Sequence, residues 1–148
     1  MHRIINISAG LFLSAAVSAS AMADTITMWT MEEQPDRMAR QEKIAAAFKA
    51  KTGHEVKVIP VTEKDIATRA TAAFAAGDLP DVLNHTVQHL LPFANAGMLD
   101  TGAANEVVEN LGANTFAAGP LGMASVDGEI VSVPTDGWTQ LVVYRADV

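Results

Sequence analysis

Two stretches in the first half of the chain alternate apolar and polar residues, and both predict strands. In TITMWTM (25–31), apolar side chains recur every second residue, which is the pattern of a half-buried strand. EVKVIPV (55–61) repeats the pattern with β-branched residues. A third apolar pair, Val82 and Leu83, predicts a very short buried strand.

A helical pattern lies between the first two strands. Pro35 suits the first turn of a helix because its fixed φ matches the helical backbone, and Gly53 suits a left-handed C-terminal cap. These two residues predict a helix from Pro35 to about Lys51. Helical spacing gives it one face with three apolar side chains and a lysine stem: Ile44, Ala47, Phe48 and Lys51.

A second helix is predicted from Glu63 to Ala76, with Gly77 as its stop. Thr62 and Asp65 resemble a weak capping box at its start. Its apolar side chains are Ile66, Ala70, Ala73 and Phe74. Strand, helix, strand, helix and strand follow one another within residues 25–83. This order predicts an α/β fold with a parallel sheet covered by helices.

The second half of the chain predicts mostly short elements. TVQHLLPFANAGMLD (86–100) predicts two short helices, with Pro92 opening the second and Gly97 ending it. AANEVVENLG (103–112) predicts another helix. GMASVDGEIVSVP (122–134) predicts a hairpin turning at Asp127-Gly128, and a final apolar strand is expected from Leu141 to Tyr144.

Residues 1–23 have the features of a secretory signal peptide. A basic start at Arg3 precedes an apolar run, and the segment closes with Ala21-Met22-Ala23, a small-x-small cleavage pattern. An N-terminal membrane anchor is the alternative, but the run is short for a span of about 20 residues. We therefore expect a mature domain over 24–148. Because the chain has no cysteine to form a disulfide or carry a lipid, we expect a soluble periplasmic protein.

Composition and motifs argue against several function classes. The net charge of −7 and the pI of about 4.9 give no electrostatic basis for binding nucleic acid or an anionic membrane surface. No G-x-S-x-G motif and no glycine-rich phosphate loop is present, and His85 and His89 lack an evident third metal ligand, since only His54 remains in the mature chain. We predict no catalytic residue, no metal and no cofactor, with a secreted hydrolase as an alternative.

Polar side chains follow the first and third predicted strands. The sequences MEEQ (31–34) and NHTVQ (84–88) occupy these positions, and ligands of open α/β sheets bind outside the carboxyl ends of strands. Carboxylates and amides suit hydroxyl-rich ligands, and Trp138 in TDGWTQ (135–140) is a plausible stacking surface for a sugar. A solvated loop is the alternative for Glu32 and Glu33. Trp29 is expected in the core.

Five segments occur in a characteristic order and spacing. They are ITMWTMEE, AAFKAKTGHEVKVIPV, AAFAAGDLPDVLNHT, LLPFANAGMLDTG and DGEIVSVPTDGWTQLVVYRADV. Behind a signal peptide, this order strongly resembles the N-terminal part of the bacterial family 1 extracellular solute-binding proteins. These are the sugar-type binding proteins of ABC importers, similar to maltose-binding protein. The resemblance implies a two-lobed protein that closes on its solute and docks on a membrane permease.

The resemblance also implies solute contacts. In the loop after the first strand it implies Glu33, with Glu32 and Gln34 as neighbouring candidates. After the third strand it implies His85 and Gln88, while Asn84 is expected only to shape the turn. Near the end of the chain it implies Trp138, and Asp136 is included in the predicted site. Members similar to maltose-binding protein carry a carboxylate at the position of Trp138, so the tryptophan is a departure.

Family members are typically more than twice as long as this chain, which is a second departure. We therefore expect the N-terminal lobe of a periplasmic binding protein, with the second lobe missing. The predicted function is non-enzymatic binding of a carbohydrate by a monomer, for delivery to ABC permease subunits. Another polar solute, such as a polyol, an osmolyte or a glycerophospho-compound, is the alternative within binding proteins.

Overall fold

A computed structural model describes residues 25–136 and Arg145. The predicted signal peptide (1–23), Trp138 and the predicted strand from Leu141 to Tyr144 lie outside these residues. Among the described helices, none is both long and apolar enough to cross a membrane.

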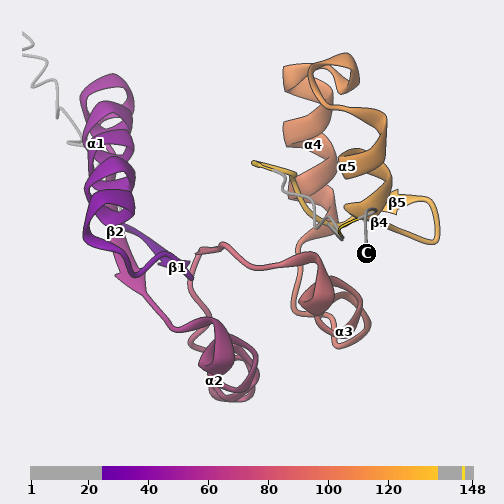
Figure 1. Cartoon of the computed structure of the whole chain (residues 1–148), viewed down its shortest axis with the longest axis horizontal. Coiled ribbons are helices and arrows are strands. Elements are labelled where there is room, and N and C mark those ends of the chain that lie inside the picture. The colour runs from indigo at the N-terminus through magenta and orange to yellow at the C-terminus, as the bar shows by residue number, and fades with distance from the viewer. Residues whose placement is uncertain (1–24, 137–144, 146–148) are drawn as a thin grey trace, which may run out of the picture.

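Three parallel strands form the sheet, in the order β2-β1-β3. β1 (Thr25–Thr30) pairs along its whole length with β2 (Glu55–Pro60) and over two residues with β3 (Val82–Leu83). α1 (Pro35–Thr52) connects β1 to β2, and α2 (Glu63–Ala76) connects β2 to β3 (Figure 1). The predicted α/β fold with a parallel sheet flanked by helices is confirmed.

Local sequence signals place both helix ends as predicted. Pro35 is at the start of α1, and Gly53 and Gly77 cap α1 and α2 with φ of 83° and 70°. These are left-handed conformations that glycine adopts without the steric penalty of a Cβ. Thr62 is the N-cap of α2, but its hydroxyl donates to the Asp65 carboxylate at 2.8 Å and makes no capping bond to the backbone.

The face of the sheet toward α2 is a buried apolar core. Register places Trp29, Ile59 and Leu83 side by side on this face. Trp29 belongs to the buried cluster that contains Ile66 of α2, and Ile59 and Leu83 pack against this cluster. Ile66 is 0% exposed and Trp29 7%. The expectation that Trp29 belongs to the core is therefore confirmed.

The opposite face, toward α1, is only partly covered. α1 buries no residue, and Ile44 and Phe48 on its predicted apolar face are 70% and 39% exposed. A hollow of about 300 Å³ lies between α1 and β2. Val82 is 44% exposed, so the prediction that it is buried with Leu83 is wrong. Its register with Met28 puts it on the α1 face, but α1 lies over β2 at the other edge of the sheet.

The chain beyond β3 forms a second group of elements, drawn from rose through orange to yellow in Figure 1. They are η1 (Val87–His89), α3 (Leu90–Asn95), α4 (Thr101–Leu111), η2 (Ala113–Thr115), α5 (Ala118–Met123), β4 (Ser125–Val126) and β5 (Glu129–Ile130). Phe93 of α3, 3% exposed, enters the core beside Trp29 and Ile66 and joins this group to the sheet.

The predictions for this half are confirmed in outline and wrong in two details. Two short helices precede α4, but Pro92 lies within the first turn of α3 instead of opening it. The hairpin turns at Asp127 and Gly128, whose φ of 52° and 86° are both positive, as a type I′ turn requires. The hairpin is shorter than predicted because the unpredicted helix α5 occupies its expected beginning.

Candidate functional site

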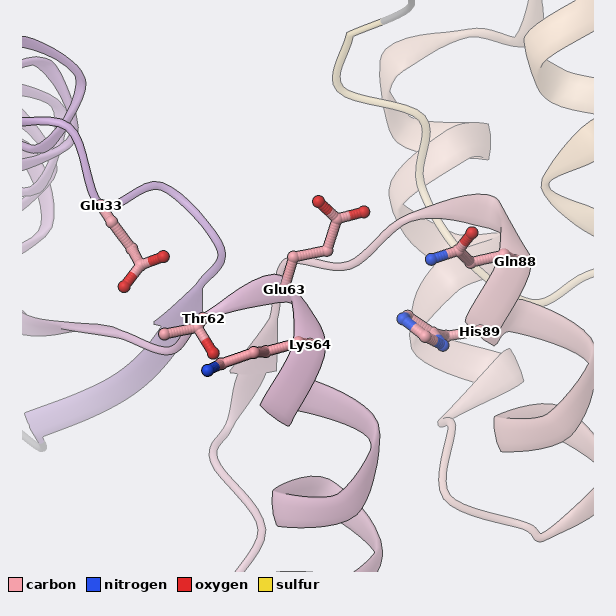
Figure 2. Close-up of a pocket in the computed structure, with 6 residues that line it drawn as sticks. All are labelled: Glu33, Thr62, Glu63, Lys64, Gln88 and His89. Atoms are coloured by element: carbon pink, nitrogen blue, oxygen red, sulfur yellow. The ribbon is translucent and has the colours of Figure 1, made fainter.

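An open hollow of about 600 Å³ lies at the carboxyl end of the sheet. Three separate segments line it, as Figure 2 shows: the loop after β1, the start of α2 directly after β2, and the η1 turn beyond β3. The lining residues are Glu33, Thr62, Glu63, Lys64, Gln88 and His89. The parallel sheet thus brings polar residues up to 56 positions apart, Glu33 and His89, to one edge.

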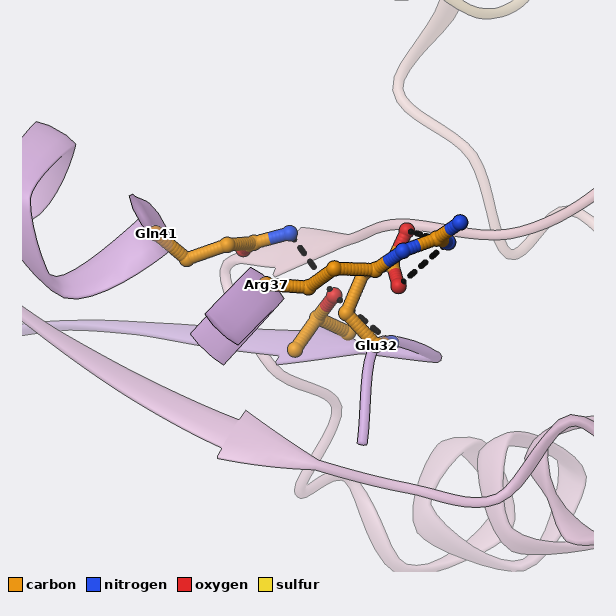
Figure 3. Close-up of polar contacts among 4 residues, drawn as sticks. Glu32, Arg37 and Gln41 are labelled. Atoms are coloured by element: carbon orange, nitrogen blue, oxygen red, sulfur yellow. Dashed lines mark hydrogen bonds and ion pairs between the residues drawn. The ribbon is translucent and has the colours of Figure 1, made fainter. Parts of the chain in front are cut away.

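The two neighbouring glutamates in the loop after β1 have different surroundings. Glu32 is held by Arg37 of α1, whose guanidinium donates to both carboxylate oxygens at 3.0 and 2.9 Å (Figure 3). The backbone N–H of Glu32 donates to the hydroxyl of Thr30 at 3.2 Å. Glu33 is exposed and lines the hollow, so of the two glutamates only Glu33 has a free carboxylate facing it.

The charge of Glu32 also acts on Arg37. The hydrogen bond to Glu32, followed by its negative charge, raises the pKa of the Arg37 side chain, and Asp136 adds to the shift. Asp136 is exposed, and its negative charge reaches the Arg37 side chain of α1. Gln34 is exposed as well, and its carbonyl accepts the backbone N–H groups of Arg37 and Met38 at the start of α1.

The first turn of α2 contributes one charge of each sign. Glu63 and Lys64 follow the N-cap Thr62 and line the hollow (Figure 2). Among the described residues, Glu33, Glu63 and Lys64 have no hydrogen-bond or ion-pair partner. Their charged groups are therefore available to a ligand.

The turn after β3 distributes its polar side chains differently from the prediction. Gln88 is exposed and lines the hollow, together with His89, which the sequence did not single out for the site. His85 does not line the hollow. Its Nδ1 lies 2.9 Å from the carbonyl oxygen of Thr86, and burial lowers its pKa. The position of His89 one residue after Gln88 was the available signal.

Asn84 continues the pairing of β3 with β1. Its backbone N–H donates to the carbonyl of Trp29 at 2.8 Å, which fixes where the chain leaves the sheet. This agrees with the expectation that Asn84 shapes the turn. Beyond it, the rings of His85 and His89 both contact Phe93, with centroids 5.4 and 5.7 Å away.

The lining side chains are hydrogen-bonding groups of both kinds. The carboxylates of Glu33 and Glu63 accept, the ammonium of Lys64 donates, and the amide of Gln88 does both. Such a set matches a ligand rich in hydroxyl groups. In the described part of the chain, no group of three or more histidine, cysteine, aspartate or glutamate side chains could hold a metal ion.

Comparison with known proteins gives consistent results. Residues 33–148 match the family of bacterial extracellular solute-binding proteins. The chain is 29% identical over 118 residues to the putative ABC transporter periplasmic-binding protein YcjN of Escherichia coli (strain K12). The aligned region covers 78% of this chain and 27% of that protein.

A solved structure shares the fold. The crystal structure of a cyclo/maltodextrin-binding protein complexed with maltotetraose superposes with a TM-score of 0.60 and 19% identity. The match covers 76% of this chain and 28% of that protein, so the chain spans little more than a quarter of either relative. Because the family match extends over most of its length, the chain belongs to the bacterial extracellular solute-binding protein family.

Proposed function

We propose that this protein is the periplasmic solute-binding component of an ABC importer and that it binds a carbohydrate in the hollow at the carboxyl edge of the sheet. The observation that carries the proposal is the convergence of six polar side chains from three separate segments on that edge. Three comparisons support it: the family match, the name of the relative as an ABC transporter periplasmic-binding protein, and the maltotetraose bound in the similar structure. The protein acts as a non-enzymatic monomer that delivers its solute to permease subunits.

The free charges around the hollow support a hydroxyl-rich solute. Carboxylates without a partner accept hydrogen bonds from sugar hydroxyls, and charge-assisted bonds of this kind are the stronger ones. Glu33 and Gln88 are the proposed contacts that line the hollow. Glu32, Gln34, Asp136 and Trp138 remain proposed contacts, with Trp138 as the stacking surface on the apolar face of a sugar ring.

A second candidate is a polar solute with an anionic group. Lys64 favours it, because its ammonium lies at the N-terminal end of α2, where the helix dipole also attracts negative charge. Glu33 and Glu63 oppose it by like-charge repulsion. Binding of glycerol 3-phosphate in preference to neutral sugars would decide for this candidate.

Fluorescence titration of the complete gene product with maltotetraose tests the carbohydrate proposal. The chain has two tryptophans, and Trp29 is buried in the core. We expect Trp138 to contribute to the spectral change on binding, and this contribution should vanish in Trp138→Ala. Loss of one charge-assisted contact in Glu33→Gln should weaken binding by about tenfold or more.

The matched control is Glu109→Gln, which removes an exposed carboxylate of α4 outside the hollow and should leave the affinity unchanged. Affinity unaffected by both Trp138→Ala and Glu33→Gln would contradict the site. Turnover of chromogenic esters or glycosides, abolished by a point substitution, would favour the secreted hydrolase instead. For the 148-residue chain alone, we expect no shift of the melting temperature at millimolar sugar.

A further inference from the structure

We propose that His85 is a positioning residue of the solute site, which holds the η1 turn with Gln88 and His89 against the core. The part of the proposal that concerns the solute rests on the proposed function, whereas the part that concerns the turn rests on geometry alone. His85 acts through the turn and not through a contact of its own with the solute.

A single carbonyl oxygen joins the two ends of the turn. The carbonyl of Thr86 accepts the backbone N–H of His89 at 3.1 Å, and Nδ1 of His85 lies 2.9 Å from the same oxygen. Because a carbonyl oxygen can only accept, this bond requires the His85 tautomer with the hydrogen on Nδ1. The imidazole of His85 therefore clamps the carbonyl on which the turn closes.

The aromatic ring of Phe93 anchors the same two histidines. His85 meets the ring at an interplanar angle of 75°, as an edge contact, and His89 lies against it at 25°, as a stack. Phe93 is buried in the core with Trp29 and Ile66. Through this ring, the turn is held in place relative to the sheet, beside which Glu33 lies in the loop after β1 and Lys64 in the first turn of α2.

The turn has no other side-chain hydrogen bond among the described residues. Thr86 is its N-cap, but the Thr86 hydroxyl makes no capping bond and is buried without a partner. Nε2 of His89 is also buried without a partner. The bond from His85 is thus the one side-chain hydrogen bond to the η1 turn among the described residues.

Acid should loosen this arrangement. Burial lowers the pKa of His85, the hydrogen bond to Thr86 partly opposes the shift, and the charge of His89 lowers the pKa further. The charged groups that line the same hollow as the turn are Glu33 from the loop after β1, with Glu63 and Lys64 from α2.

The sign of the pH effect follows from the lowered pKa. The folded turn prefers neutral His85, so its contribution is complete above the ordinary histidine pKa of about 6.5 and is lost as the pH falls below it. The protonated ring keeps the Nδ1–H donor. Acid instead weakens the packing of the ring against Phe93, because a charged imidazole is unfavourable in this half-buried position.

Three substitutions separate the two contacts of His85. His85→Asn keeps an N–H donor near the position of Nδ1 and removes the ring, His85→Phe keeps a ring on Phe93 and removes the donor, and His85→Ala removes both. His54→Asn is the matched control, because His54 is an exposed histidine beside the Gly53 cap.

The first measurement needs no solute. Hydrogen exchange of the His89 amide is followed by NMR at pH 7 in the complete gene product. Exchange should be about three- to tenfold faster in His85→Phe and His85→Ala, the change expected for loss of one hydrogen bond. It should stay near wild type in His85→Asn and in the His54→Asn control.

The second measurement is titration with maltotetraose between pH 5 and 8. Affinity should fall in the same order as protection of the amide, and the acid weakening of wild type should be absent in His85→Asn. Unchanged exchange in His85→Ala would overturn the proposal whatever the solute does. Equal loss of affinity in His85→Asn and His85→Ala, with normal exchange, would overturn it in favour of direct contact. Faster exchange in His85→Phe and His85→Ala, in a protein whose wild type binds no sugar, would support the clamp and contradict the proposed function.

Discussion

One long helix lies against each face of the three-stranded sheet, α2 on one side and α1 on the other, and the two layers pack differently. Toward α2, Ile66 and Ala70 are fully buried against Trp29. Toward α1, no helical residue is buried, and a hollow of about 300 Å³ remains beside β2. Both helices carry an apolar face, so the difference lies in what the rest of the fold places against that face.

Polar contacts hold α1 where apolar packing is thin. Thr30, fully buried on the α1 face, accepts hydrogen bonds from the Gln41 side chain at 3.1 Å and from the Glu32 backbone at 3.2 Å. Lys49 pairs with Glu55 of β2 at 2.8 Å, but both side chains are exposed. The α2 face is thus stabilised by buried area, and the α1 face mainly by a few hydrogen bonds.

The comparison is tested most strongly by the same substitution on both faces. Ile66→Ala should lower the free energy of unfolding by about 2–5 kcal/mol, because it opens a cavity in a closely packed core. Ile44→Ala should change it by less than about 0.5 kcal/mol, since Ile44 is 70% exposed. Urea unfolding of the complete gene product measures both, and similar losses would contradict the difference between the faces.

On the α1 face, a buried hydroxyl should contribute more to the free energy of unfolding than an apolar side chain. Thr30→Ala should lower the free energy of unfolding by about 1–2 kcal/mol, because the Glu32 backbone N–H and the Gln41 amide lose their acceptor. Thr30→Ser keeps the hydroxyl and serves as the control in the same urea experiment. Equal losses in the two variants would assign the effect to packing of the methyl group.

A cation on the α2 face should make a smaller contribution to the free energy of unfolding. The guanidinium carbon of Arg69 lies 4.6 Å from the centre of the Trp29 ring. Arg69→Met keeps much of the apolar stem and removes the charge, and should cost about 0.5–1 kcal/mol in thermal or urea unfolding. Arg69→Lys should recover part of that loss. No loss in Arg69→Met would show that the stem alone supports the core.

The smallest effect is expected where β3 meets β1. Asp81 accepts the backbone N–H and the hydroxyl of Thr27 at 2.7 and 2.8 Å, and these bonds lower the pKa of its carboxyl group. Its contribution is present above the ordinary pKa and is lost as the pH falls through the lowered value.

Because Asp81 is exposed, solvent screening keeps this contribution below about 0.5 kcal/mol. Unfolding curves of wild type and Asp81→Asn between pH 2 and 7 should converge in acid. A stability difference that persists at pH 2 would show that the carboxylate charge is not its origin.

Prediction from the sequence succeeded where a residue acts on its own backbone. Pro35, Gly53, Gly77 and the Asp127-Gly128 turn are examples, because restricted or positive φ is a local property. The helix α5 was missed because AGPLGM contains two glycines and a proline, which disfavour a helix in isolation. Only the surrounding fold makes that helix form.

The candidate site was likewise predictable from the sequence only in part. The sequence determined that Glu33 and Gln88 follow parallel strands, and parallel strands place their carboxyl ends at one edge, where both residues are found.

Only the tertiary structure decided that Arg37 engages Glu32, that His85 turns to Thr86 and Phe93, and that His89 lines the hollow instead. It also decided that the apolar face of α1 stays exposed while that of α2 is buried. The reason is physical: periodicity tells which side chains share a face, whereas burial and pairing depend on partners that are distant in sequence.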